Sequence, residues 1–256
     1  MSNFYDNGSF WSSFPDKTYP QQAPGNAVQA EPGKVYVSFG WSDGDNIGFD
    51  QQPIYDLWHN KARGTVPVGT TLSPTLQELN PPLLDWYYSQ MTANDDLECA
   101  VSGIQYIFPK DYNDKMFPAW CKLTKQWSHD AGFLDIGFNP AGMSKDKYNT
   151  FMRICGSNAA FSIIQLNHPT SIRGAQVRSE EALYNDCIKL GQPNPRGPIF
   201  LGFDCTVAGF VGRGGGYTAI KNVADRLQAA YPGRYVFLLQ KDQIATMREY
   251  YGRLKQ

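Results

Sequence analysis

Short apolar, β-branched segments alternate with longer segments of helical periodicity from residue 34 to residue 251, and this alternation most constrains the fold. The strand-like segments are bounded by Gly, Pro, Asn or Asp, which break regular structure. They lie at 34–39, 66–71, 97–101, 134–137, 161–165, 199–203 and 235–239, with a weaker eighth at 172–177. Strands that alternate with helices form a mostly parallel sheet, because parallel neighbours need a crossover connection. The fold class predicted is therefore α/β.

Six helices are predicted between these strands from helical spacing and from terminal signals such as Pro81, the Glu180-Glu181 pair and Pro232-Gly233. They span 83–91, 115–131, 144–154, 180–190, 217–231 and 241–251. Seven or eight strands in about 220 residues favour one barrel-like (β/α) domain over residues 34–256. A doubly wound open sheet is the alternative.

Residues 1–33 are rich in Asn, Gly, Ser, Pro and Gln and show no periodicity, which predicts an irregular N-terminal arm. Its aromatic side chains include Phe10, Trp11 and Phe14. We expect them to pack on the domain or on a neighbouring molecule, because an exposed apolar series promotes association. The arm would suit a homo-oligomer or a larger assembly.

The charge balance argues against several classes of partner. Lys and Arg number 23 and Asp and Glu number 24, so neither nucleic acid nor an anionic membrane surface is expected as the main partner. No apolar run approaches the roughly 18 residues of a membrane span, and no secretory signal is recognisable at the N-terminus. We expect either a cytoplasmically made assembly component or an extracellular protein whose signal has been removed.

The five cysteines show no CxxC or Cys/His spacing of a metal site. Cys99, Cys155 and Cys205 lie in or beside apolar runs, which predicts buried free thiols. A disulfide-framed secreted fold is therefore not expected.

The segment Ser42-Asp43-Gly44-Asp45-Asn46 follows the first strand, where functional residues of parallel sheets gather. Asp43 and Asp45, with a third acid, could divide the roles of glycoside hydrolysis. Together with Asn46 they could instead bind Ca²⁺ through hard oxygen ligands, with no other cofactor expected. A solvated Asx turn is the plainest alternative.

Several blocks of the sequence resemble the C-terminal domain of the GxGYxYP family of putative glycoside hydrolases. They are KVYVSFGWSDGDN at 34–46, the RG…P…SP…L…P…L…YY pattern at 63–88, NDD…SGIQYIFP at 94–109, and the closing YVFLLQKDQIATMREYY at 235–251. The resemblance implies a barrel-like α/β domain with a sugar-processing role.

The chain departs from the family pattern within the naming motif. Gly103, Tyr106 and Pro109 are kept, whereas Gln105 replaces a glycine and Phe108 replaces a tyrosine. Gln240 and Gln243 stand where the resemblance implies Arg-like and His-like residues. These departures favour a site that binds sugar without cleaving it.

Our first hypothesis is a glycoside hydrolase that acts through paired carboxylates on a polymer or glycan. The candidate catalytic residues are Asp43, Asp45, Asp95 and Asp204. The candidate substrate-binding residues are Trp41, Asn46, Trp58, Tyr106, His168 and Arg213, the aromatic rings serving as sugar platforms.

Two alternatives stay open. A non-catalytic carbohydrate-binding or structural module of a virion or cell-surface assembly would explain the altered motif, so enzyme activity is not settled by the sequence. A metal-dependent hydrolase using Asp43, Asp45 and His168 is less favoured, because no HxxxH or HExxH pattern is present. The convergence of the four aspartates in one pocket would distinguish the hydrolase.

Overall fold

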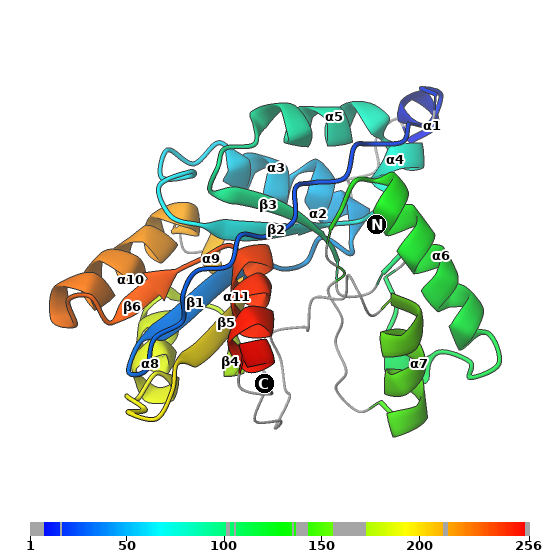
Figure 1. Cartoon of the computed structure of the whole chain (residues 1–256). Helices are drawn as coiled ribbons and strands as arrows, with labels where there is room; N and C mark the ends of the chain where they lie inside the picture. The colour runs from blue at the N-terminus through cyan, green and yellow to red at the C-terminus, as the bar shows by residue number, and fades with distance from the viewer. Residues whose placement is uncertain are drawn as a thin grey trace.

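The computed structural model describes residues 8–15, 17–100, 103–104, 106–134, 136, 143–155, 173–211 and 215–253. A parallel sheet forms the centre of the molecule, with helices on its two faces (Figure 1). Its strands are β1 (Val35–Trp41), β2 (Val68–Leu72), β3 (Asp95–Cys99), β4 (Arg173–Val177), β5 (Ile199–Cys205) and β6 (Tyr235–Phe237). The predicted α/β class is confirmed.

The six predicted helices are all present, with ends shifted by a few residues. They are α5 (Pro81–Gln90), α6 (Phe117–Asp130), α7 (Lys145–Cys155), α8 (Glu180–Leu190), α10 (Gly216–Ala230) and α11 (Gln240–Arg253). Five short helices and a 3₁₀ turn were not predicted, because one turn is too short to show periodicity. They are α1 (Gly8–Trp11), α2 (Ile47–Gln51), α3 (Pro53–Trp58), α4 (Leu76–Leu79), α9 (Val207–Val211) and the turn Pro109–Asp111.

Strand β1 lies at the centre of the sheet and pairs with three other strands. The strand order is β3-β2-β1-β5-β4, and β6 also pairs with β1. All seven residues of β1 pair with β5, from Val35 with Ile199 to Trp41 with Cys205. On its other edge, β1 pairs first with β6 and then, at Gly40 and Trp41, with β2. The order therefore changes direction at β1, which is where open α/β sheets bind ligands.

A closed barrel is not confirmed, and the described residues form fewer strands than the seven or eight predicted. Within the described ranges the path runs from β3 to β4 without closing. The predicted strand at 134–137 is represented by one parallel bridge between Ile136 and Cys99. The predicted strand at 161–165 lies outside the described residues, whereas the weakly predicted strand at 172–177 is present as β4.

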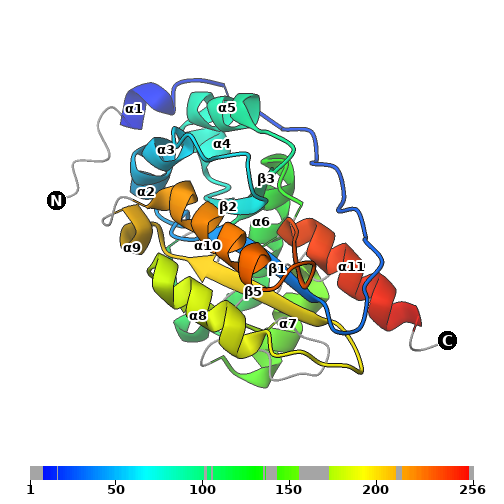
Figure 2. The ribbon, with the colours of Figure 1, turned by 90° about the vertical axis from the view of Figure 1, so that its left-hand side faces the viewer.

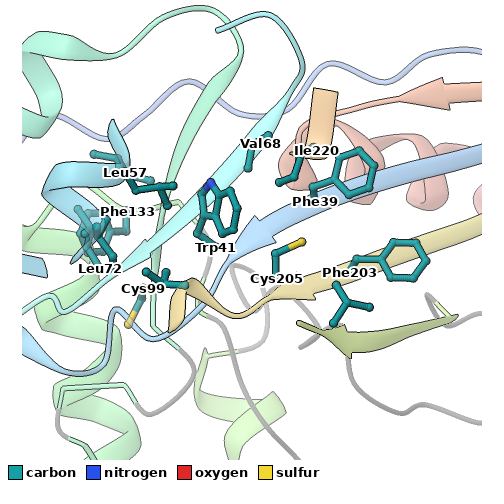
Figure 3. Packing of buried hydrophobic residues seen from close by; sticks show 14 of the residues in the cluster. Phe39, Trp41, Leu57, Val68, Leu72, Cys99, Phe133, Phe203, Cys205 and Ile220 are labelled. Atoms are coloured by element: carbon teal, nitrogen blue, oxygen red, sulfur yellow. The ribbon is translucent and has the colours of Figure 1, made fainter. Parts of the chain in front are cut away.

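One face of the sheet carries the main apolar core. Val37, Phe39 and Trp41 of β1 lie on this face, aligned with Leu201, Phe203 and Cys205 of β5. Figure 3 shows Ile220 of α10 beside Phe39 in this cluster. Each such side chain contributes roughly 1.5–3 kcal/mol when fully buried, so this face supplies much of the stability. All five cysteines are buried free thiols, which confirms the prediction made for Cys99, Cys155 and Cys205.

The opposite face of the sheet is unusually polar. The pairing aligns Asp96, Gly69, Gly40, Asp204 and Gln176 in one row across five strands. Aligned residues of a parallel sheet point to the same side, so this face carries acids separated by glycines.

Helix α11 packs on the polar face over β1 and β5 (Figure 1). Its Gln243 side chain accepts a hydrogen bond from Ser38 Oγ at 2.7 Å. Gln243 Nε2 also donates to the carbonyl oxygens of Tyr36 and Leu201, at 2.9 and 2.8 Å. Gln243, a departure from the family pattern, thus ties the last helix to the two central strands.

The N-terminal arm lies along the domain, from α1 past the edge of β3 to α11 (Figure 2). The Gln22 side chain accepts from the N–H of Leu97 at 3.1 Å and donates to the Leu97 carbonyl oxygen at 2.6 Å. One side-chain amide thereby imitates a neighbouring strand and covers the outer edge of β3. Further along, the Val28 N–H donates to Thr246 Oγ1 of α11. Among the described residues, no helix combines the length and apolar character needed to cross a membrane.

We expect Gln243→Leu to lower the free energy of unfolding by about 2–4 kcal/mol. The change leaves a buried hydroxyl and two buried carbonyl oxygens without this partner, at roughly 1–3 kcal/mol for each unsatisfied group before relaxation. Urea unfolding followed by circular dichroism measures the effect. Gln192→Leu is the control, since Gln192 is exposed and its side chain donates to the Ile188 carbonyl oxygen of the preceding helix, α8. Equal stability of the two variants would contradict the role given to Gln243.

Candidate functional site

The loop that follows β1 is pressed against the end of β2. A Cβ atom at Gly44 would lie 1.8 Å from the carbonyl oxygen of Thr71, so only glycine fits here. Thr71 Oγ1 also accepts the N–H of Gly44 at 3.3 Å. The preceding residue, Asp43, has a φ of 75°, a left-handed conformation that Asp tolerates better than most residues. The two acids of the loop are therefore held in fixed positions.

Asp43 links this loop to the chain that leaves β5. Its Oδ2 accepts the N–H of Val207 at 2.9 Å, and the N–H of Ala208 also bonds the carboxylate, at the start of α9. Burial raises the pKa of Asp43, while these two bonds and the positive charge of Arg178 oppose the rise.

Asp204 lies in β5, beside Gly40 of β1 and Gln176 of β4. Its residue is 6% exposed, and burial is the main cause that raises its pKa to about 6. The charges of Asp43 and Asp45 raise the pKa further, whereas hydrogen bonds from Ser42 and Gln176 oppose the rise. Three of the four predicted acids, Asp43, Asp45 and Asp204, are therefore close enough for their charges to interact.

Asp45 and Asn46 open onto a groove of about 640 Å³. The groove is built from the chain segments after β1, β2 and β3 and from helices α4 and α6. Its lining residues are Asp45, Asn46, Ile47, Ser73, Thr75, Leu79, Ile104, Tyr106, Leu123 and Trp127. Asn46 also caps α2, since its Oδ1 accepts the N–H of Gly48 at 3.0 Å.

Asp50 of α2, a buried acid that was not predicted, contacts a residue of the groove wall. Its Oδ2 accepts the N–H of Ser73 at 3.1 Å, which positions a groove residue. Burial raises the pKa of Asp50 well above its usual range, and the charge of Asp45 adds to the rise. A single acid in a one-turn helix gives no sequence signal, which is why Asp50 was missed.

The structure does not bring Asp95 to this group. Asp95 is the first residue of β3, so it lies at the amino end of the parallel strands, away from the loop at 42–46. Its Oδ2 accepts from Arg63 Nη1 at 2.6 Å and from the N–H and hydroxyl of Thr92. These bonds make Asp95 a structural acid.

Trp41 and Trp58 do not form sugar platforms. Trp41 is 0% exposed and packs edge-on against Phe210 and Tyr217, because β1 runs two residues further than predicted and carries the ring into the core. Trp58 is 3% exposed, and its Nε1 donates to Thr70 Oγ1 at 3.2 Å.

Tyr106 does lie in the groove, and its residue is 66% exposed. His168 and Arg213 lie outside the described residues. Two groove residues of α6, Leu123 and Trp127, were missed, although their i, i+4 spacing places them on one helix face.

The calcium hypothesis for Asp43, Asp45 and Asn46 stays a prediction. One oxygen of Asp43 and the side-chain oxygen of Asn46 each accept a backbone N–H. In the part of the chain that the structure describes, no group of three or more His, Cys, Asp or Glu residues is arranged to hold a metal ion.

Gly44→Ala is expected to lower the free energy of unfolding by about 1–3 kcal/mol, because the added methyl group forces the loop away from the Thr71 carbonyl. Thermal and urea unfolding measure the loss. Gly252→Ala is the matched control, since a Cβ atom there meets nothing within 4 Å. A neutral Gly44→Ala would show that the loop is free to move.

Asp204→Asn is expected to change the pH dependence of stability. A folded-state pKa of about 6, above the unfolded value of about 3.9, means that ionising Asp204 destabilises the fold. The contribution of Asp204 to the free energy of unfolding of the wild type is thus largest below pH 4, and it is lost as the pH rises to 6. The asparagine side chain of the Asp204→Asn variant does not titrate. The free energy of unfolding of the variant, relative to that of the wild type, should therefore rise by roughly 2 kcal/mol between pH 4 and pH 7. Urea titrations across this range test it; a pH-independent difference would contradict the raised pKa.

Residues 33–151 match the model of the GxGYxYP putative glycoside hydrolase C-terminal domain. The resemblance seen in the sequence blocks is confirmed over this range. No curated protein sequence matches the chain significantly.

Two solved structures share the fold. A putative hydrolase from Bacteroides thetaiotaomicron VPI-5482 has a TM-score of 0.74 and 19% identity over 97% of this chain and 51% of its own. A putative polysaccharide deacetylase from Mycobacterium smegmatis has a TM-score of 0.50 and 11% identity, over 92% of this chain and 96% of its own. This chain thus spans about half the length of the Bacteroides protein. At these identities the likeness shows the fold alone.

Proposed function

We propose that this protein, whose residues 33–151 match the GxGYxYP family model, hydrolyses a glycosidic bond in the groove that begins at Asp45. The observation that carries the proposal is the grouping of Asp43, Asp45 and Asp204 at the carboxyl ends of β1 and β5, with Asp45 in the wall of that groove. Glycoside hydrolysis needs two carboxyl groups in different protonation states, and a cluster of acids in unlike surroundings provides them.

Asp204 is the proposed general acid. Burial raises its pKa to about 6, so about half of the Asp204 carboxyl groups carry a proton at pH 6 and roughly a tenth at pH 7. The proton passes to the glycosidic oxygen as the bond between that oxygen and the anomeric carbon breaks. The Ser42 and Gln176 hydrogen bonds hold the carboxyl in place.

Asp45 is the proposed second carboxylate, because it lies in the groove wall where a sugar ring would meet it. It either takes a proton from the attacking water or attacks the anomeric carbon itself, and the distance between the two carboxyl groups in a complex distinguishes these routes. Asp43 is a positioning residue, since its carboxylate is bonded to the start of α9.

A non-catalytic carbohydrate-binding module is the second candidate. The departures at Gln105 and Phe108 in the naming motif support it, as does the use of Gln243 to bond the sheet. In that case the groove binds a glycan and the raised pKa of Asp204 has no role in turnover. A place in a virion or cell-surface assembly would suit such a module.

The test is cleavage of a panel of polysaccharides and aryl glycosides, with products identified by mass spectrometry. Asp45→Asn and Asp204→Asn should each lower kcat by at least about 10²-fold, the usual contribution of one acid or base. Asp111→Asn is the control, because Asp111 pairs with Lys110 on the surface and does not line the groove.

The outcomes separate the candidate functions. Binding of a glycan without cleavage by wild-type protein would support the module and overturn the hydrolase. Cleavage that persists in Asp45→Asn and Asp204→Asn would overturn the assigned residues. Cleavage that is lost on chelation and restored by Ca²⁺ or another divalent ion would instead favour a metal-dependent reaction.

A further inference from the structure

The groove has two chemically different ends. The polar residues Asp45, Asn46, Ser73 and Thr75 all come from the segments after β1 and β2. Most of the apolar residues come from α4, the segment after β3 and α6, and together they are called the apolar end. They are Leu79, Ile104, Tyr106, Leu123 and Trp127, and Ile47 of α2 is a further apolar residue, next to Asn46. Polar groups are thus concentrated at the proposed catalytic end.

The apolar end is accessible to a ligand. Leu79 and Leu123 are 43% and 45% exposed, and both face the same groove. Tyr106 adds an exposed ring that meets the exposed Phe108 edge-on, with ring centroids 6.4 Å apart. Several large apolar side chains that are exposed together usually mark a binding surface, whereas single exposed ones do not.

The composition of this end argues against a continued sugar chain. Leu79, Ile104 and Leu123 offer no hydrogen-bonding side-chain atom, and the two aromatic rings offer one each. Sugar hydroxyls placed there would lose their bonds to water with few replacements, which is unfavourable. An alkyl or aryl group, or the hydrocarbon part of an acyl group, loses no hydrogen bonds to water in the same place, and burying its apolar surface is favourable.

We infer that the substrate is an amphiphilic glycoside, with its sugar at the Asp45 end and an apolar aglycone along Leu79, Leu123 and Trp127. This inference rests on the proposed function, because it assigns the leaving-group side of the same groove. Leu123 and Trp127 are one helical turn apart on α6, about 6 Å along its axis, so together they form a continuous wall for such a group.

The test measures binding of n-alkyl thioglucosides and thiomaltosides by calorimetry, below their micelle concentrations. A sulfur-linked aglycone resists hydrolysis, so binding is read independently of turnover. We expect affinity to rise by up to about fourfold for each added methylene group, until the chain reaches the end of the groove. Octyl tetraethylene glycol ether, with the same chain and no sugar, should bind at least tenfold more weakly, because it leaves the polar end uncontacted.

Leu123→Ser should flatten the dependence on chain length without unfolding the protein, since Leu123 is largely exposed. Met116→Ser is the matched control, because Met116 is an exposed apolar residue at the start of the same helix but outside the groove. An unchanged slope in Leu123→Ser, or an equal loss in both variants, would overturn the assignment of the groove.

A parallel cleavage assay with oxygen-linked alkyl glucosides and unmodified oligosaccharides separates the two proposals. Faster cleavage with longer alkyl chains supports both. Cleavage of oligosaccharides without any benefit from an alkyl group overturns the aglycone assignment and leaves the hydrolase standing. Chain-dependent binding without cleavage of any glycoside overturns the hydrolase, and with it the assignment of a leaving group. Equal affinity for the sugar-free ether overturns the inference alone.

Discussion

Strand β1 is bound on both edges along its length, and the position of every functional group depends on this pairing. Its seven residues pair with β5 on one side, while β6 and then β2 pair with it on the other. All seven are buried, and the chain leaves the sheet directly after Trp41. The close approach of Gly44 to the Thr71 carbonyl then fixes the next turn. As a result Asp43 and Asp45 lie close enough to Asp204, in β5, for their charges to interact.

The acids are held together at a cost in stability. Like charges and burial both disfavour ionisation of Asp204, and burial also disfavours ionisation of Asp43 and Asp50. The cost is partly offset by the N–H groups at the start of α9 and by the Ser42 and Gln176 bonds. A left-handed Asp43 adds local strain. Strain and unfavourable charge kept at one place are typical of sites selected for function rather than for stability.

Much of the sheet could be predicted, because buried strands have strong sequence signals. The alternating residues Val35, Val37, Phe39 and Trp41 of β1 also show why the prediction of Trp41 as a sugar platform was wrong. Alternation with a period of two continues through Trp41 and places it with the core residues, so its burial was predictable from the strand itself. Asp95 could likewise have been set aside, since it precedes its strand and the functional edge lies after strands.

Other features left no signal to find. The helices α2 and α9 are five residues long, too short for helical periodicity, yet they place Asp50 and receive the Asp43 carboxylate. The groove forms because α6 and the loop after β1 both line it, and local sequence patterns do not predict which distant segments come together. Loops are placed by the tertiary packing around them, so the shape of a site is the last property to be read from sequence.

The central claim is that Asp43, Asp45 and Asp204 form one interacting group. The most direct measurement is a carbon-13 NMR titration of the aspartate carboxyl groups in wild-type protein and in Asp45→Asn. Asp204 should titrate near pH 6 in the wild type and at a lower pH in the variant, because one neighbouring negative charge is removed. A pKa of Asp204 near 3.9 that does not respond to the substitution would contradict the claim.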